Sequence, residues 1–159
     1  MELHWVGTEA ADEIARIARE LFFEVYPYVS EEGLEKFIES CQTPDRIREQ
    51  LENGTRYAYI IDEDGSRAGY LAFEVLKDRA HFSKLYLFPG YRGKGIGNRC
   101  MIEIEDIAHR MGADTMYLEV NCLNTGAISL YRRRGYREID RVKGKEYTQI
   151  IMEKDLRSG

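Results

Sequence analysis

The residues best suited to chemistry lie between Phe82 and Cys100, where an apolar run gives way to spaced glycines and then to a helical repeat. The glycines fall at the start of an expected helix, where free N–H groups and the helix dipole favour an anion and no Cβ obstructs it. The pattern Arg92-x-x-Gly95-x-Gly97 fits neither a Walker A loop nor a dinucleotide fingerprint. The residues expected to bind a pyrophosphate are Arg92, Gly93, Lys94, Gly95, Ile96 and Gly97.

A second motif follows about one helix and one strand later: Asn124-x-x-Ala127-x-x-x-Tyr131-x-x-x-Gly135-Tyr136. Together, the two motifs resemble those of the GNAT superfamily of N-acetyltransferases in order and spacing, and they cover about a third of the chain. The resemblance implies acetyl-CoA as the acetyl donor and a primary amine as the acceptor.

The same resemblance implies roles for residues on the strand and helix of these motifs. Backbone groups of Leu85, Tyr86 and Leu87 would hold the pantetheine arm of CoA where two strands splay apart. Asn124 would cap the following helix and bond that arm, and Ala127 lies in the first turn of the same helix. Tyr131, on this helix, would be the general acid near the sulfur.

Two residues compete for the role of general base, which must take a proton from the attacking amine. Glu119 lies in Leu118-Glu119-Val120, which is similar to a run in peptide N-terminal acetyltransferases, where the glutamate is the base. His81 stands at a strand position where many members of the family carry glutamate, and a neutral imidazole is a competent base near pH 7. Both remain candidates.

The loop between the first two expected helices is rich in aromatic rings and carboxylates, and it resembles the lip of the acceptor pocket in the GNAT family. Such rings and carboxylates suit an alkylammonium chain. The acceptor is therefore expected to be a small polyamine or another cationic amine, with a protein N-terminus or lysine as the alternative. A non-catalytic acetyl-CoA-binding module is a further alternative. The expected acceptor-binding residues are Glu24, Tyr26, Tyr28 and Glu31.

Hydrophobic periodicity and turn signals predict alternating short elements. Their order, β-α-α-β-β-β-α-β-α-β-β, resembles the GNAT fold, an α/β (α+β) arrangement with a mixed, mostly antiparallel sheet flanked by helices. We expect one domain over residues 1–159. Strands are expected at 3–6, 57–61, 68–76, 80–88, 115–120, 136–140 and 147–152, and helices at 11–25, 30–41, 44–51, 95–111 and 125–134. Two of these helices are expected to bury one apolar face each: Ile14, Ile17, Leu21, Phe22 and Val25 in the first, and Ile96, Cys100, Ile104, Ile107 and Met111 in the helix at 95–111.

Composition limits the partners that this chain can have. Of its 159 residues, 43% are hydrophobic and 32% charged, with no apolar run long enough for a membrane helix and no signal peptide, so a cytoplasmic location is expected. Three histidines and three cysteines without metal-ligand spacing predict no metal. The net charge of −5 disfavours nucleic acid, despite the basic run Arg132–Arg134. Residues 1–64 are acidic, as suits a cationic acceptor, and the final strand offers an edge for a homodimer.

Overall fold

The structure, a computed structural model, describes residues 1–157 and divides the chain into two compact units. Both units take residues from the middle of the chain, because the third and fourth strands contribute to each of them. The expectation of one domain over residues 1–159 stays a prediction. The first unit comprises Met1–Ala72 and Lys84–Arg92, and the second comprises Phe73–Ser83 and the chain from Gly93 onward.

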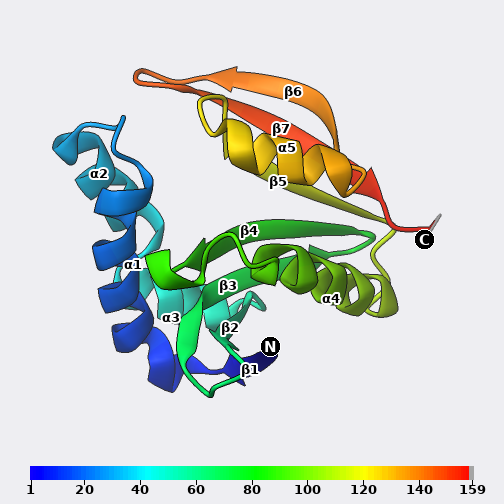
Figure 1. The fold of residues 1–159 in the computed structure, drawn as a ribbon, viewed down its shortest axis with the longest axis horizontal. Helices are drawn as coiled ribbons and strands as arrows, with labels where there is room; N and C mark the ends of the chain where they lie inside the picture. The colour runs from blue at the N-terminus through cyan, green and yellow to red at the C-terminus, as the bar shows by residue number, and fades with distance from the viewer. Residues whose placement is uncertain (158–159) are drawn as a thin grey trace. The chain divides into compact units, whose positions relative to one another are not determined.

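The first unit contains three α-helices and the N-terminal strands (Figure 1). Strand β1 pairs antiparallel with β2, and helix α1 packs against both α2 and α3. Its elements are β1 (Glu2–Val6), η1 (Thr8–Ala10), α1 (Ala11–Val25), α2 (Glu31–Cys41), α3 (Pro44–Glu52), β2 (Arg56–Ile61), η2 (Pro89–Tyr91) and parts of β3 (Arg67–Leu76) and β4 (Arg79–Leu87).

The core of the first unit forms on one face of α1. Ile14, Ile17 and Leu21 recur at helical spacing and are fully buried, as expected for the inner face of an amphipathic helix. Phe22 continues this face and packs against the Tyr86 ring of β4, with 4.8 Å between the ring centroids. The core of the first unit therefore holds the end of β4, where the cofactor-binding strand is predicted.

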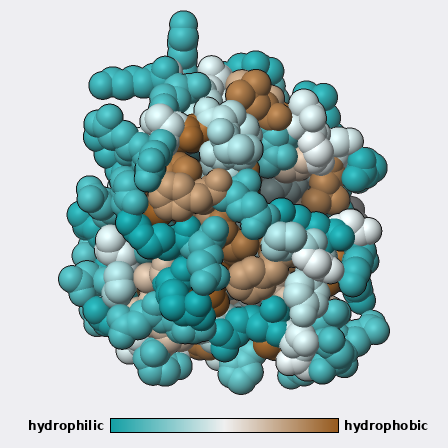
Figure 2. All heavy atoms as spheres, turned by 60° about the vertical axis from the view of Figure 1, so that its left-hand side comes forward, coloured by the Kyte–Doolittle hydropathy of each residue, from teal (hydrophilic) through white to brown (hydrophobic). Residues whose placement is uncertain are grey.

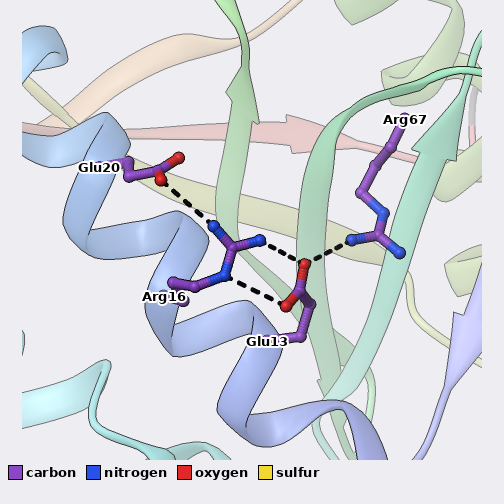
Figure 3. Close-up of polar contacts among 4 residues, drawn as sticks. All are labelled: Glu13, Arg16, Glu20 and Arg67. Atoms are coloured by element: carbon purple, nitrogen blue, oxygen red, sulfur yellow. Dashed lines mark hydrogen bonds and ion pairs between the residues drawn. The ribbon is translucent and has the colours of Figure 1, made fainter.

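A network of exposed ion pairs joins α1 to β3 (Figure 3). Glu13 accepts hydrogen bonds from Arg16 at 2.6 Å and from Arg67 at 2.8 Å, and Arg16 also reaches Glu20 at 3.2 Å. The hydrogen bond from Arg16 is the main cause that lowers the pKa of Glu13. Because all four side chains are exposed, the network adds little to stability, and the apolar face of α1 carries most of the packing.

The second unit contains the remaining strands and two helices. Strand β5 pairs parallel with β4 and antiparallel with β7, and β7 pairs antiparallel with β6. The strands are hydrogen-bonded in the order β1-β2-β3-β4-β5-β7-β6. The elements of this unit, besides parts of β3 and β4, are α4 (Ile96–Arg110), β5 (Thr115–Asn121), α5 (Thr125–Arg133), β6 (Arg137–Lys143) and β7 (Thr148–Asp155).

The predicted fold class is confirmed, with a mixed and mostly antiparallel sheet and helices between its strands. Helix α3, which the predicted order of main elements leaves out, was expected at 44–51 and spans Pro44–Glu52. The sequence also placed Met111 on the buried face of α4, and this was wrong. Met111 follows the last helical residue and is 41% exposed, whereas Met101 and Ala108 are fully buried.

Within residues 1–157, no helix is both long and apolar enough to cross a membrane. Figure 2 shows one face of the molecule, on which hydrophilic residues cover most of the surface and hydrophobic residues appear as separate patches. In β6, all seven residues are exposed, including Ile139 and Val142. The edge strand is therefore uncovered on both faces in the single chain.

Candidate functional site

The glycine turn before α4 is built on left-handed backbone conformations. Gly93 has a φ of +75° and Gly95, the N-cap residue of α4, has a φ of +80°. A Cβ at either position would meet no atom of the described chain within 4 Å. Glycine is therefore required here by the backbone angle and not by contact with another part of the described chain.

The N-terminus of α4 has the chemistry of an anion site. In the described chain, no side chain caps this helix, and its first turn carries no acidic residue. The first N–H groups of a helix then need an external acceptor, and the dipole favours one with negative charge. Arg92 and Lys94 lie just before α4 in the sequence, and both are exposed. The N-terminus of α4 can therefore bind an anion.

Arg92 makes two contacts within the first unit that the sequence did not predict. Its guanidinium lies 2.8 Å from the carboxylate of Glu24, and its Nε donates a hydrogen bond to the carbonyl oxygen of Leu87 at 2.9 Å. A residue expected to bind the cofactor thus holds a residue expected to bind the acceptor. Among the three predicted strand residues, Leu87 therefore has its carbonyl engaged by a side chain.

The pairing of β4 with β5 is short. In the described residues, it extends from Arg79 opposite Thr115 to His81 opposite Tyr117, although both strands continue. From Leu118 onward, β5 pairs with β7 only. Strand backbone without a strand partner can hydrogen-bond a peptide-like ligand.

The side chain of Tyr86 is not accessible to a bound cofactor. It is buried in the core of the first unit, and its hydroxyl lies 2.9 Å from that of Tyr26. A Cβ on Gly69 would collide with the carbonyl oxygen of Tyr86, so only glycine permits this approach of β3 to β4. Tyr86 can therefore offer a cofactor only its backbone, and Tyr26 commits its hydroxyl to the core.

The remaining residues of the predicted acceptor lip are more accessible. Tyr28 is 37% exposed and packs edge-on against Tyr26, with 6.1 Å between the ring centroids. Glu31 is exposed in the first turn of α2, which begins after the capping residue Ser30. Of the four predicted acceptor residues, the exposed groups are thus the Tyr28 ring and the carboxylates of Glu24 and Glu31.

Helix α5 begins as predicted, with Asn124 as its capping residue. The Asn124 side-chain oxygen accepts a hydrogen bond from the Ala127 N–H at 3.2 Å. Asn and Asp favour this position because they satisfy an N–H group that the helix leaves free. The amide nitrogen of Asn124 makes no hydrogen bond with residues 1–157, so it is available to a ligand.

Tyr131 presents an unpaired phenol. The residue is half-buried, and burial raises its pKa to about 12. Its hydroxyl has no hydrogen-bond partner in the described chain, and it is not among the fully enclosed polar atoms that lack a partner. The hydroxyl therefore stays protonated in neutral solution, reaches solvent and is free to donate.

The two candidates for the general base lie in contact. His81 Nε2 and Glu119 Oε1 are 2.8 Å apart, and His81 Nδ1 lies 3.7 Å from a carboxylate oxygen of Glu74. The register explains the contact, because Tyr117 is opposite His81 and Glu119 lies two residues further on the same face of β5. Nε2 is enclosed and meets no criterion for a hydrogen bond in the described chain, so the two side chains make a close polar contact.

Sequence reasoning missed the residues that hold this pair. The Tyr117 ring stacks on His81 at 4.4 Å and 6°, and the Arg79 guanidinium lies 3.9 Å from the centre of the Tyr117 ring. Arg79 also pairs with Glu153 of β7 at 3.1 Å. These contacts depend on the parallel register of β4 and β5, and a single sequence does not reveal that register.

The predicted residues are divided between the two units. No three His, Cys, Asp or Glu side chains of residues 1–157 gather as a metal site, and the expectation of a metal-free reaction stays a prediction. The first unit holds Glu24, Tyr26, Tyr28, Glu31, Leu85, Tyr86, Leu87 and Arg92, and the second holds His81, Gly93, Lys94, Gly95, Ile96, Gly97, Glu119, Asn124, Ala127 and Tyr131.

Comparison with known proteins gives the family. Residues 11–136 match the acetyltransferase (GNAT) family. Three relatives illustrate its range. An uncharacterized N-acetyltransferase of Mycobacterium bovis is 32% identical over 80% of this chain and 83% of its own length. The spermidine N(1)-acetyltransferase of Thermoplasma acidophilum is 24% identical over 99% of both chains. The ribosomal protein bS18 alanine N-acetyltransferase of Escherichia coli is 29% identical over 54% of this chain and 58% of its own.

A solved structure has the same fold. The PaiA N-acetyltransferase of Thermoplasma acidophilum, crystallised with coenzyme A, superposes with a TM-score of 0.81 at 23% identity, over 98% of this chain and 99% of its own. The motifs, the strand order and the family match agree over most of the chain. The chain therefore belongs to the acetyltransferase (GNAT) family and is an N-acetyltransferase.

Proposed function

We propose that this enzyme transfers the acetyl group of acetyl-CoA to a small polyamine or another cationic amine, by direct attack within a ternary complex. The observation that carries the proposal is the contact between His81 and Glu119, at 2.8 Å. Two groups that can accept a proton therefore lie in contact. The same chain also has, at Tyr131, a phenol hydroxyl without a hydrogen-bond partner in the described residues. We also infer one catalytic domain over residues 1–159, because the family match at 11–136 runs through both units.

The donor would be held mainly by backbone groups. The uncapped N–H groups of α4, with Arg92 and Lys94, would bind the diphosphate, and the amide of Asn124 with the backbone of Leu85 would bind the pantetheine arm. Bound acetyl-CoA supplies a thioester carbonyl for attack. The chain's own contribution is to orient that carbonyl and to manage two protons.

Glu119 is the member of the pair that would take the proton of the amine. A lysine-like amine is neutral in only about one molecule per thousand at pH 7, so attack requires a proton acceptor. His81 Nε2 is enclosed, whereas the Glu119 side chain is 31% exposed. Glu119 would therefore receive the proton, directly or through water. His81, which lies in contact with Glu119, would influence how strongly the carboxylate holds that proton.

Tyr131 would act on the leaving group. As the amine nitrogen bonds to the carbonyl carbon and the C–S bond breaks, negative charge develops on sulfur. Complete proton transfer from a phenol with a pKa of about 12 to a thiolate with one near 8.5 is uphill by roughly 5 kcal/mol. A hydrogen bond from the Tyr131 hydroxyl to the developing thiolate has no such cost. We therefore assign Tyr131 as a donor that stabilises the leaving thiolate, which takes up a solvent proton afterwards.

The acceptor assignment rests on the exposed groups of the predicted lip. Glu24 and Glu31 supply negative charge and Tyr28 an aromatic face, which suit an alkylammonium chain. The spermidine acetyltransferase relative, which matches over nearly the full length, supports a polyamine. The run Leu118-Glu119-Val120 and the relative that acetylates a ribosomal protein favour a peptide N-terminus as the second candidate.

A thiol-release assay with acetyl-CoA tests both assignments. The acceptors are spermidine, free lysine, a peptide with an N-terminal alanine, and none. We expect the highest kcat/KM with spermidine. A higher value with the peptide would replace the polyamine assignment, and no amine-dependent release would contradict catalysis. Glu31→Gln should raise the KM for spermidine about threefold and leave that for acetyl-CoA unchanged, while Glu39→Gln, on the same helix, serves as the matched control.

A further inference from the structure

A buried carboxylate that the proposed reaction does not use lies on α4. The Glu105 side chain is 8% exposed and accepts three short hydrogen bonds. Arg134 donates at 2.7 Å, Lys154 at 2.8 Å and the Tyr136 hydroxyl at 2.9 Å. A buried carboxylate is costly unless it is paired and hydrogen-bonded, and here the three donors satisfy it.

These donors come from three separate parts of the second unit. Arg134 is the C-cap residue of α5, Tyr136 precedes β6, and Lys154 lies on β7. Glu105 thus joins the middle of α4 to the far end of α5. The first of these helices begins at the predicted diphosphate site, and the second carries Tyr131.

The partners of Glu105 also hold Tyr131. The Tyr131 carbonyl accepts hydrogen bonds from the N–H of Tyr136 at 2.9 Å and from that of Arg134 at 3.1 Å. The Tyr136 ring packs edge-on against the Tyr131 ring, with 6.1 Å between the centroids. Both the backbone and the ring of Tyr131 are therefore held by residues that Glu105 fixes through their side chains.

The Tyr131 hydroxyl has no hydrogen bond of its own in residues 1–157, so only packing sets its direction. We propose that Glu105 is a positioning residue for catalysis, which aims the Tyr131 phenol through Tyr136 and Arg134. This inference rests on the proposed role of Tyr131 as the donor to the leaving thiolate. Misplacing a reacting group by about 1 Å can lower a rate by about 10²-fold, so a partial loss of alignment should be measurable.

The test is a double-mutant cycle on the single-turnover rate of acetyl transfer, with saturating acetyl-CoA and spermidine. Glu105→Gln keeps the shape of the side chain and removes its charge, and we expect it to lower the rate about tenfold with little change in the KM for acetyl-CoA. In the Tyr131→Phe background, the same substitution should cause no further loss. Asp106→Asn, on the exposed face of α4, is the matched control and should keep the full rate.

The failure of this inference is distinct from the failure of the proposed function. If Tyr131→Phe lowers the rate and Glu105→Gln lowers it by the same factor in both backgrounds, Glu105 does not act through Tyr131. If Tyr131→Phe leaves the rate unchanged, the donor role and the inference are both overturned. Should Glu105→Gln not fold, Tyr136→Phe takes its place, because it removes one hydrogen bond to Glu105 and keeps the ring against Tyr131.

Discussion

The strand pair that carries His81 and Glu119 and the helix that carries Tyr131 belong to the same compact unit, yet their surroundings are opposite. Around His81, the structure places the carboxylates of Glu74 and Glu119 and the Tyr117 ring. Around the Tyr131 side chain, it places an aromatic ring and no hydrogen-bond partner for the hydroxyl in the described chain. One group is surrounded by charge, and the other is isolated from it.

This difference matches what each region is proposed to do. Taking a proton from an ammonium is easier beside negative charge, whereas a donor must stay protonated, which burial without charge ensures. The comparison also shows where each region is vulnerable. The contact between His81 and Glu119 depends on strand register, and the direction of the Tyr131 phenol depends on the packing around it.

The largest effect is expected from removing the isolated phenol. Tyr131→Phe should lower the single-turnover rate by about 10²-fold, the usual scale for losing a hydrogen bond made in the transition state. Thermal unfolding of the variant should stay close to that of the parent, because the lost hydroxyl has no partner in residues 1–157. A fully folded variant with an unchanged rate would show that the phenol has no catalytic part.

The next effect distinguishes His81 from Glu119 as the general base. Glu119→Gln should lower the rate by roughly 10²-fold, while His81→Asn should lower it about tenfold, because the exposed carboxylate meets the amine and the enclosed imidazole acts through it. Steady-state rates with spermidine measure both. The reverse ranking would make His81 the base and Glu119 its support.

A smaller effect is expected at Arg92, in the first unit. Arg92→Ala should raise the KM for acetyl-CoA about tenfold, since one charge-assisted hydrogen bond to a phosphate is lost. The KM for the amine should not rise, because the substitution releases Glu24 from its ion pair. Arg110→Ala, at the other end of α4, is the control. Equal weakening of both substrates would contradict the diphosphate role.

The smallest effect concerns stability in alkali. Burial raises the pKa of Tyr131 from 10.0 to about 12, so the phenol is protonated in both folded and unfolded chains below pH 10. Between pH 10 and 12 the unfolded chain ionises first, and the folded chain loses stability as pH rises. Between pH 10 and 11, the free energy of unfolding should fall by roughly 1 kcal/mol more in the parent than in Tyr131→Phe. Urea unfolding at the two pH values measures this, and an equal fall in both proteins would contradict the shift.

Several features of the site were predictable from the sequence because they depend on short stretches of chain. Asn124 caps α5, the glycines precede α4, and apolar spacing identified the inner face of α1. The same reasoning failed at Met111, where a regular spacing continued past the last helical residue. Periodicity does not show where a helix ends or which neighbour covers its final turn.

The amino-acid sequence by itself determined the family motifs, the element order and the chemical types of the candidate residues, since backbone angles, caps and hydrophobic periods act over a few residues. Only the tertiary structure decided which side chains meet. His81 touches Glu119, Arg92 holds Glu24, and Glu105 gathers three donors because strand register and helix packing bring distant segments together. Those contacts depend on the whole fold, and no local pattern in the chain encodes them.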